Sequence, residues 1–242
     1  MFSSKKTFFV GAGSALLLIA VQFDYNASQL PQFLTARAGI VLGYNPPTNR
    51  PFLQRTEGAG SRGRRKCSTY LQLFAPSDHV AVSVSERPTF LAYVSRTDLP
   101  LSFVLVEEGA EYPIYERDLR VSSPGVVSFS LPPSIKLKKR LYQWTVSAVC
   151  NRKQPSKNVY AQAKFERAIA SEQLQNRLKG KNALQQAAIY ADSGVWYEAI
   201  AKGYEAGTAK ESDRSEKEEY LDLLNSIGLQ KITNLLANAN SR

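Results

Sequence analysis

The sequence predicts an α+β protein in which an antiparallel β-sandwich is followed by a helical C-terminal region. Between residues 67 and 170, apolar and polar residues alternate in short runs of strand length, separated by turn signals. After residue 170 the apolar spacing changes from every second residue to every third or fourth, which is the period of a helix. With 242 residues, of which 43% are hydrophobic, the chain is long enough to bury a substantial core.

The N-terminus carries the pattern of an export signal. Lys5 and Lys6 precede an uncharged apolar run over residues 7–23, which Asp24 ends. We expect residues 1–27 to be either a cleaved signal peptide or an N-terminal membrane anchor, because a run of this length can just cross a thin bilayer. The chain is therefore expected to be exported from the cytoplasm.

Residues 28–66 are predicted to form a linker. Prolines and glycines punctuate this segment, and no strand or helix period persists in it. It holds seven Lys or Arg against one acidic residue, so much of the chain's net charge of +10 lies here. The segment ends in a basic cluster that consists of Arg62, Arg64, Arg65 and Lys66.

Residues 67–170 are predicted to form the β-sandwich, with seven to nine short strands. The clearest strand covers residues 141–150, where every second side chain from Tyr142 to Cys150 is apolar. Regular turn signals about every 8–12 residues favour an immunoglobulin-like sandwich. A true immunoglobulin domain is not expected, because Trp144 shares its strand with Cys150 and Ala148 stands where that fold has a tyrosine.

Cys67 and Cys150 are the only two cysteines, and both lie in phase with apolar neighbours. In an exported chain we expect them to form a disulfide. Closing a loop of about 84 residues would stabilise the fold by roughly 4–5 kcal/mol in the chain-entropy model. The alternative is two buried free thiols. A cysteine nucleophile is not expected, because the single histidine, His79, lies in a separate turn.

Residues 171–237 are predicted to be helical. Residues 182–191 place Ala183, Ala187 and Ala191 on one helical face, and a second stripe follows over residues 195–206. A capping box, Ser215 with Glu218, marks a further helix start. The order of small, aromatic and glycine residues resembles one tetratricopeptide repeat. Because a solenoid needs about three repeats, packing of this hairpin on the sandwich is favoured over a peptide-binding groove.

Several motifs in this order resemble the domain of unknown function 928 family, over residues 58–236. The motifs are residues 58–63, Cys67, residues 87–90, 131–132 and 142–144, Cys150, and residues 166–167, 190–191, 194–199, 223–224 and 228–229. That family occurs mainly in cyanobacteria, in chains that begin with a signal peptide. The resemblance implies a cell-envelope setting. It implies no catalytic residue and no cofactor, because the family has no assigned activity.

The function expected from these features is a non-catalytic extracytoplasmic module that binds an envelope protein or a glycan. One histidine and two cysteines offer too few ligands for a typical metal site, and no cofactor is expected. An alternative is a hydrolase of an envelope polymer that uses paired carboxylates. The available carboxylates lie in segments that resemble turns, where solvated side chains are the usual outcome: Glu107, Glu108, Glu111, Glu116 and Asp118.

A second alternative is docking on an anionic membrane surface through two basic clusters. The first is the cluster at residues 62–66, and the second consists of Lys136, Lys138, Lys139 and Arg140. We expect Lys136 and Lys138 to alternate along a strand, where they could also serve to block edge-to-edge pairing. Nucleic acid is not an expected partner, because the chain is predicted to be exported and lacks a recognisable nucleic-acid-binding motif.

Overall fold

The computed structural model describes residues 42–239 apart from 49, 59–68, 97 and 211. All of these residues belong to one compact unit, Gly39–Arg242. The predicted signal or anchor at residues 1–27, the basic cluster at residues 62–66 and Cys67 lie outside the described residues.

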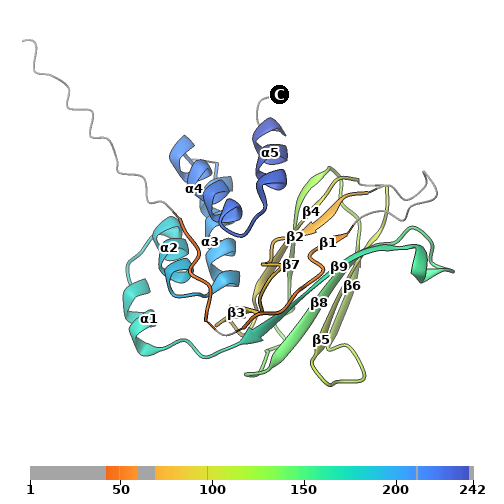
Figure 1. Cartoon of the computed structure of the whole chain (residues 1–242), viewed down its shortest axis with the longest axis horizontal. Coiled ribbons are helices and arrows are strands. Elements are labelled where there is room, and N and C mark those ends of the chain that lie inside the picture. Colours follow the sequence, from red (N-terminus) through yellow and green to blue (C-terminus); the bar gives the residue numbers. More distant parts are fainter. Residues whose placement is uncertain (1–41, 49, 59–68, 97, 211, 240–242) are drawn as a thin grey trace, which may run out of the picture. The chain divides into compact units, whose positions relative to one another are not determined.

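The strands of the described residues form two sheets (Figure 1). One sheet has the strand order β1-β2-β4-β7 and is formed by β1 (Glu57–Gly58), β2 (Leu71–Leu73), β4 (Thr89–Val94) and β7 (Gly125–Ser130). The other has the order β3-β9-β8-β5-β6 and is formed by β3 (Ala81–Ser83), β9 (Val159–Arg167), β8 (Leu141–Ala148), β5 (Leu101–Glu107) and β6 (Tyr115–Leu119). A short 3-10 helix, Pro155–Lys157, connects β8 to β9.

Aromatic side chains pack the two sheets against each other. The ring of Phe90 on β4 lies 5.0 Å from that of Trp144 on β8 and 5.3 Å from that of Phe165 on β9, measured between centroids. All three side chains are fully buried. Because side chains alternate across a strand, the apolar residues at every second position share one face, and the two faces meet here. The predicted α+β fold with a sandwich-like pair of sheets is confirmed at this level.

One strand pairing differs from the predicted purely antiparallel sandwich. β3 pairs with β9 in parallel, so that Ala81 lies opposite Phe165 and Ser83 opposite Arg167, whereas the other named pairs are antiparallel. Alternation indicates which face of a strand is buried but not the direction of its partner. β8 also ends at Ala148 rather than at residue 150, because the Cys150 N–H donates to Asn158 Oδ1 instead of to a neighbouring strand.

The described part of the predicted linker, residues 42–58, packs along the sandwich and is called the strap below. Leu42 is buried, and the Asn45 N–H donates to the carbonyl of Ala191. Strap carbonyls also accept backbone hydrogen bonds from both sheets, which protects strand edges. These bonds run from Leu73 N to Thr56 O at 2.9 Å and from Gln162 N to Arg55 O at 2.8 Å. Prolines prevent a regular period in this segment, which is why the sequence pattern does not reveal its packing.

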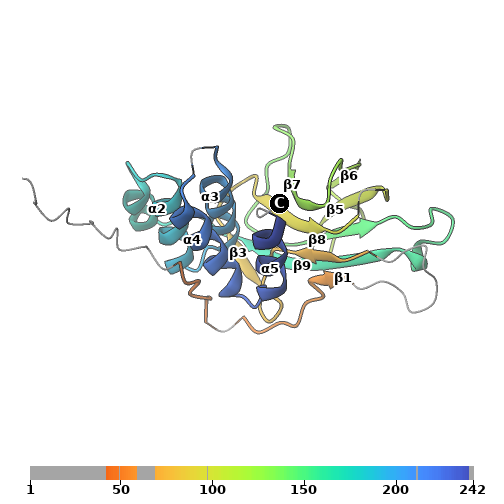
Figure 2. The same cartoon turned by 90° about the horizontal axis from the view of Figure 1, so that it is seen from above.

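Within the part of the chain that the structure describes, five α-helices lie on one side of the sheets in both views (Figures 1 and 2). They are α1 (Glu172–Leu178), α2 (Ala183–Asp192), α3 (Trp196–Thr208), α4 (Arg214–Asn225) and α5 (Gln230–Ala239). The central helix, α3, packs on α2 and α4 and also contacts β3 and β4. The predicted capping box at Ser215 is wrong by two residues, because Asp213 and Glu216 form the box that begins α4. Within the described residues, no helix is long and apolar enough to cross a bilayer.

Candidate binding groove

Two buried tryptophans fix α3 on the sandwich. Trp144 on β8 donates its indole N–H to the hydroxyl of Tyr197 on α3 at 2.8 Å. Trp196 on α3 donates in the opposite direction, to the carbonyl of Phe74 at 2.8 Å. Burial raises the pKa of the Tyr197 phenol, so this hydroxyl stays protonated. Paired buried donors and acceptors of this kind hold the helix and the sheets in one orientation.

Glu198 adds a third polar connection between α3 and the end of β3. Its carboxylate accepts hydrogen bonds from Ser83 Oγ at 2.6 Å and from the backbone N–H groups of Ser85 and Val84 at 3.0 and 3.2 Å. Burial raises the pKa of Glu198, and these hydrogen bonds partly oppose that rise. We call the contacts of Trp144, Trp196, Tyr197 and Glu198 the junction.

A groove lies beside the junction, where three separate segments meet. It consists of two adjoining cavities of about 470 and 320 Å³, which share Ser77, Ile227 and Gly228. The strap contributes one wall, the turn after β2 another, and the α4–α5 turn the third. The lining residues are Tyr44, Pro46, 54–57, Gln72, Ala75, 77–79 and 226–229.

The smaller cavity contains a hydrogen-bonded chain of three side chains. His79 Nδ1 lies 2.7 Å from Asp78 Oδ1, and His79 Nε2 lies 3.1 Å from the hydroxyl of Tyr44. A carboxylate can only accept, so in the neutral ring Nδ1 carries the proton and Nε2 accepts from the phenol. The Tyr44 ring also stacks on His79 and contacts Trp196 edge-on, which connects this chain to the junction.

The two ends of this row of hydrogen-bonded side chains differ in charge and exposure. Burial, with a further contribution from Asp78, raises the pKa of Tyr44, so its phenol stays neutral. The Asp78 side chain is 77% exposed and can accept further hydrogen bonds at the groove. The walls are also held in place, because Lys231 on α5 lies 3.7 Å from the Glu57 carboxylate and over the Tyr70 ring.

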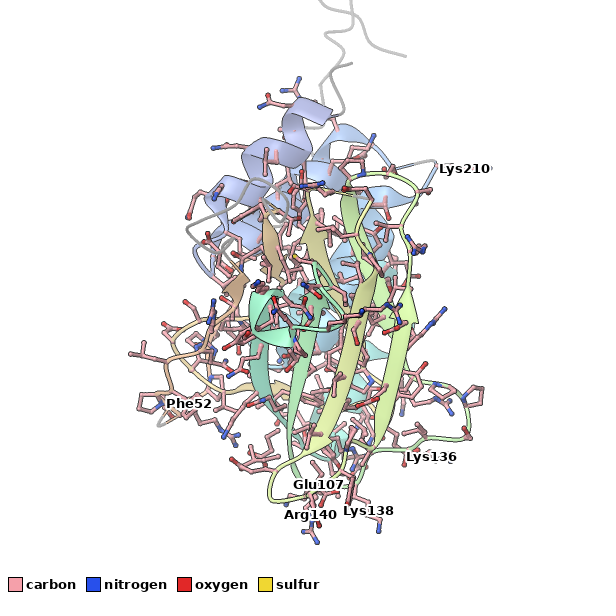
Figure 3. All side chains as sticks on the ribbon, turned by 90° about the vertical axis from the view of Figure 1, so that its right-hand side faces the viewer. Phe52, Glu107, Lys136, Lys138, Arg140 and Lys210 are labelled. Atoms are coloured by element: carbon pink, nitrogen blue, oxygen red, sulfur yellow. The ribbon has the colours of Figure 1, made fainter. Side chains whose placement is uncertain are left out.

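The second predicted basic cluster lies in a loop and not on a strand. Lys136, Lys138, Lys139 and Arg140 belong to the connection between β7 and β8. Leu137 is buried while its neighbours are exposed, which produces the alternation that suggested a strand. Figure 3 shows Lys138 and Arg140 together with Glu107 at one end of the sandwich, with Lys136 nearby.

Three of the carboxylates considered for hydrolysis face cations. Glu107 lies 3.4 Å from Arg140, Glu108 lies 2.5 Å from Lys164, and Asp118 lies 3.5 Å from Arg152. Glu116 and Asp118 belong to the edge strand β6 and not to a turn. These ion pairs are typical of a solvated surface.

The sequence does not reveal the site of His79. Tyr44 lies 35 positions earlier, within the predicted linker, and no motif connects the two residues. The predicted disulfide stays a prediction, because Cys67 lies outside the described residues. Cys150 is half-buried directly after β8.

Together these features define a class of protein in which a two-sheet sandwich carries helices fixed through a buried polar junction. A family model described as Domain of Unknown Function (DUF928) matches residues 57–236, and the chain belongs to this family. Residues 194–199, one of the motifs that resemble the family, provide the α3 side of the junction.

The chain is similar to one solved structure, a DUF3244 family protein with an immunoglobulin-like β-sandwich fold from Bacteroides vulgatus ATCC 8482. The two are 11% identical with a TM-score of 0.26, over 46% of this chain and 98% of that one. No curated protein sequence matches the chain.

Proposed function

We propose that the protein is a non-catalytic module of the periplasm or cell envelope that binds a protein or glycan partner in the groove. The observation that supports this most is the groove lining, in which hydrogen-bonding groups from three segments converge beside a rigid junction. Pre-positioned polar groups with apolar neighbours are typical of binding sites. The Tyr44 hydroxyl donates its proton to His79, so it would offer its oxygen to the partner as an acceptor, and the exposed Asp78 carboxylate would offer a second acceptor.

The proposed location outside the cytoplasm rests on the apolar segment at residues 7–23 and on the envelope setting that the family resemblance implies. In that setting Cys67 and Cys150 would form a disulfide. Whether the N-terminal segment is cleaved or retained as an anchor does not change the proposal.

We also infer an immunoglobulin-like sandwich and a single tetratricopeptide-like hairpin formed by α2 and α3. Ala187, Ala191 and Ile200 of this hairpin are fully buried in the shared core. This burial supports a packing role for the hairpin and leaves partner binding to the groove.

The groove is tested by retrieving partners with the immobilised full chain from two separate extracts of the source organism: envelope proteins and solubilised wall glycan. The double variant Tyr44→Phe/Asp78→Asn removes the Tyr44 hydroxyl and the Asp78 charge, and we expect it to retrieve at least about tenfold less partner. The matched control Tyr112→Phe/Asp118→Asn makes the same two exchanges at exposed positions on and before β6.

Equal retrieval by all three proteins would contradict the groove as the binding site. Release of soluble fragments from wall polymer, lost when Glu107 or Glu108 becomes alanine, would instead establish the hydrolase alternative.

A further inference from the structure

We propose that the loop between β7 and β8 docks the protein on an anionic lipid surface through Lys136, Lys138, Lys139 and Arg140. We call residues 131–140 the basic loop. The proposal deepens the proposed function by naming a surface on which an envelope module would work. It depends on the location proposed above and not on the groove.

The basic loop is held in one conformation by contacts in its middle. Leu137 is buried, and its N–H donates to the carbonyl of Glu86 at 2.9 Å. The Tyr142 hydroxyl accepts from the Lys138 N–H and donates to the Lys138 carbonyl, at 3.0 Å in both cases. Because the backbone is already ordered, docking would cost little further conformational entropy.

The charged groups of the loop are available to a ligand. Lys138 and Lys139 are exposed and form no ion pair with the described residues. Lys136 lies 3.6 Å from Glu86 and Arg140 lies 3.4 Å from Glu107, and both basic side chains are more than 60% exposed. Exposed pairs of this kind are weak, so phosphate oxygens can replace the carboxylates. Glu86 would keep Arg167, at 3.9 Å, as a partner.

Apolar groups beside the loop favour a membrane over a soluble polyanion. The Glu108 N–H donates to the Leu141 carbonyl, which places the β5–β6 turn next to the end of the basic loop. Tyr112 in that turn is 72% exposed, and Leu141 is 37% exposed. A tyrosine ring fits the level of the lipid headgroups, where its hydroxyl stays hydrated. Glu111 in the same turn is exposed and opposes contact, so we expect the lysine side to face the lipid.

Binding to vesicles tests the proposal with the full chain. The measured quantity is the excess of binding to phosphatidylglycerol–phosphatidylcholine vesicles over pure phosphatidylcholine vesicles, which removes the contribution of the apolar N-terminal segment. For Lys138→Ser/Lys139→Ser we expect the anionic excess to fall about thirtyfold at low salt. The control Lys179→Ser/Lys210→Ser removes the same charge elsewhere, and Figure 3 shows Lys210 at the opposite end from Lys138. We expect the control to keep the excess.

The excess should disappear as added salt shortens the screening length, since exposed charges carry it. Equal loss in the two double variants, or an excess that persists in high salt, would overturn the proposal. So would a wild-type chain that binds soluble heparin but shows no anionic excess on vesicles. A chain that is exported and yet fails this test would leave the proposed envelope location standing.

Discussion

At the scale of single residues, the two tryptophans of the chain donate hydrogen bonds in opposite directions across one contact. Trp144 reaches from the sandwich to Tyr197, and Trp196 reaches from α3 to the backbone beyond β2. A buried N–H without an acceptor is costly, so each bond disfavours any displacement of α3. The alternation around residue 144 predicts that Trp144 is buried, but a pattern within one strand does not identify an acceptor 53 positions away.

Replacing Tyr197 with phenylalanine tests this contact. The variant keeps the ring and leaves the Trp144 N–H buried without its partner, so we expect the free energy of unfolding to fall by about 1–3 kcal/mol. Urea denaturation measures the change. The exposed exchange Tyr112→Phe should alter stability by less than about 0.5 kcal/mol. A Tyr197→Phe variant as stable as this control would contradict the role given to the bond.

Glu198 predicts a specific dependence of stability on pH. Burial raises its pKa in the folded protein above the ordinary value of 4.5, so the folded state binds the proton more tightly than the unfolded state. The contribution of Glu198 to stability is therefore greatest below about pH 4.5. It declines as the pH rises through the raised pKa of the folded state.

Denaturation of Glu198→Gln at several pH values checks this prediction. The amide does not titrate, so the stability difference between wild type and variant should change between about pH 4.5 and the raised pKa of Glu198. Over this range the wild type should become less stable relative to the variant as the pH rises. The variant should also be less stable at low pH, because its N–H₂ group would occupy one of the two oxygen positions. There it would face either the Val84 N–H, which donates to Oε2, or the Ser85 N–H, which donates to Oε1. A stability difference that is constant with pH would contradict the raised pKa of Glu198 in the folded protein.

At the scale of elements, α3 and α4 approach each other closely through glycines. A Cβ on Gly207 would lie 2.9 Å from the Cβ of Tyr220, and one on Gly203 would lie 3.3 Å from Leu223. Tyr220 is buried, so neither helix can yield easily. The sequence places Gly203 on the apolar stripe of its helix, but it does not show that the partner is Tyr220.

The exchange Gly207→Ala should separate these helices and destabilise the protein by about 1–3 kcal/mol, despite the better helix propensity of alanine. Gly43→Ala is the matched control, because no described atom outside its two chain neighbours lies within 4 Å of the added Cβ there. Thermal unfolding distinguishes the two variants. A Gly207→Ala protein that melts with or above Gly43→Ala would contradict the close contact.

The sequence predicts most elements, and its errors have identifiable causes. The change of apolar period near residue 170 falls between the end of β9 at Arg167 and the start of α1 at Glu172. Two overlapping capping patterns, Asp213 with Glu216 and Ser215 with Glu218, are equally good locally, and the structure uses the first. The basic loop has the sequence pattern of a strand, because a buried Leu137 lies between the exposed residues Lys136 and Lys138. The strap is missed because its contacts, backbone bonds as well as side-chain contacts such as that of Tyr44 with His79, join it to distant segments.

At the scale of the whole molecule, one apolar core extends from the sandwich into the helices. Phe90 and Trp144 of the sheets and Ile200, Leu224 and Ile232 of the helices belong to the same buried cluster. A shared core of this kind makes separate unfolding of the two regions unfavourable. The groove depends on this continuity, because its walls come from both regions.

We therefore expect the protein to unfold in a single transition. Far-UV circular dichroism at a helix-sensitive wavelength and tryptophan fluorescence should give the same urea midpoint, since the helices and the sandwich report on one event. Two separated midpoints would show that the helices unfold independently of the sandwich. That result would contradict a stable groove formed by both regions.

The proposed location outside the cytoplasm is tested most directly by fractionating the source cells. The intact mass of the native protein is then measured with and without reductant. We expect the protein in the envelope or periplasmic fraction, with a mass that rises by about 2 Da on reduction as the Cys67–Cys150 disulfide opens. A cytosolic protein with two free thiols, whose mass does not change on reduction, would contradict both the location and the disulfide.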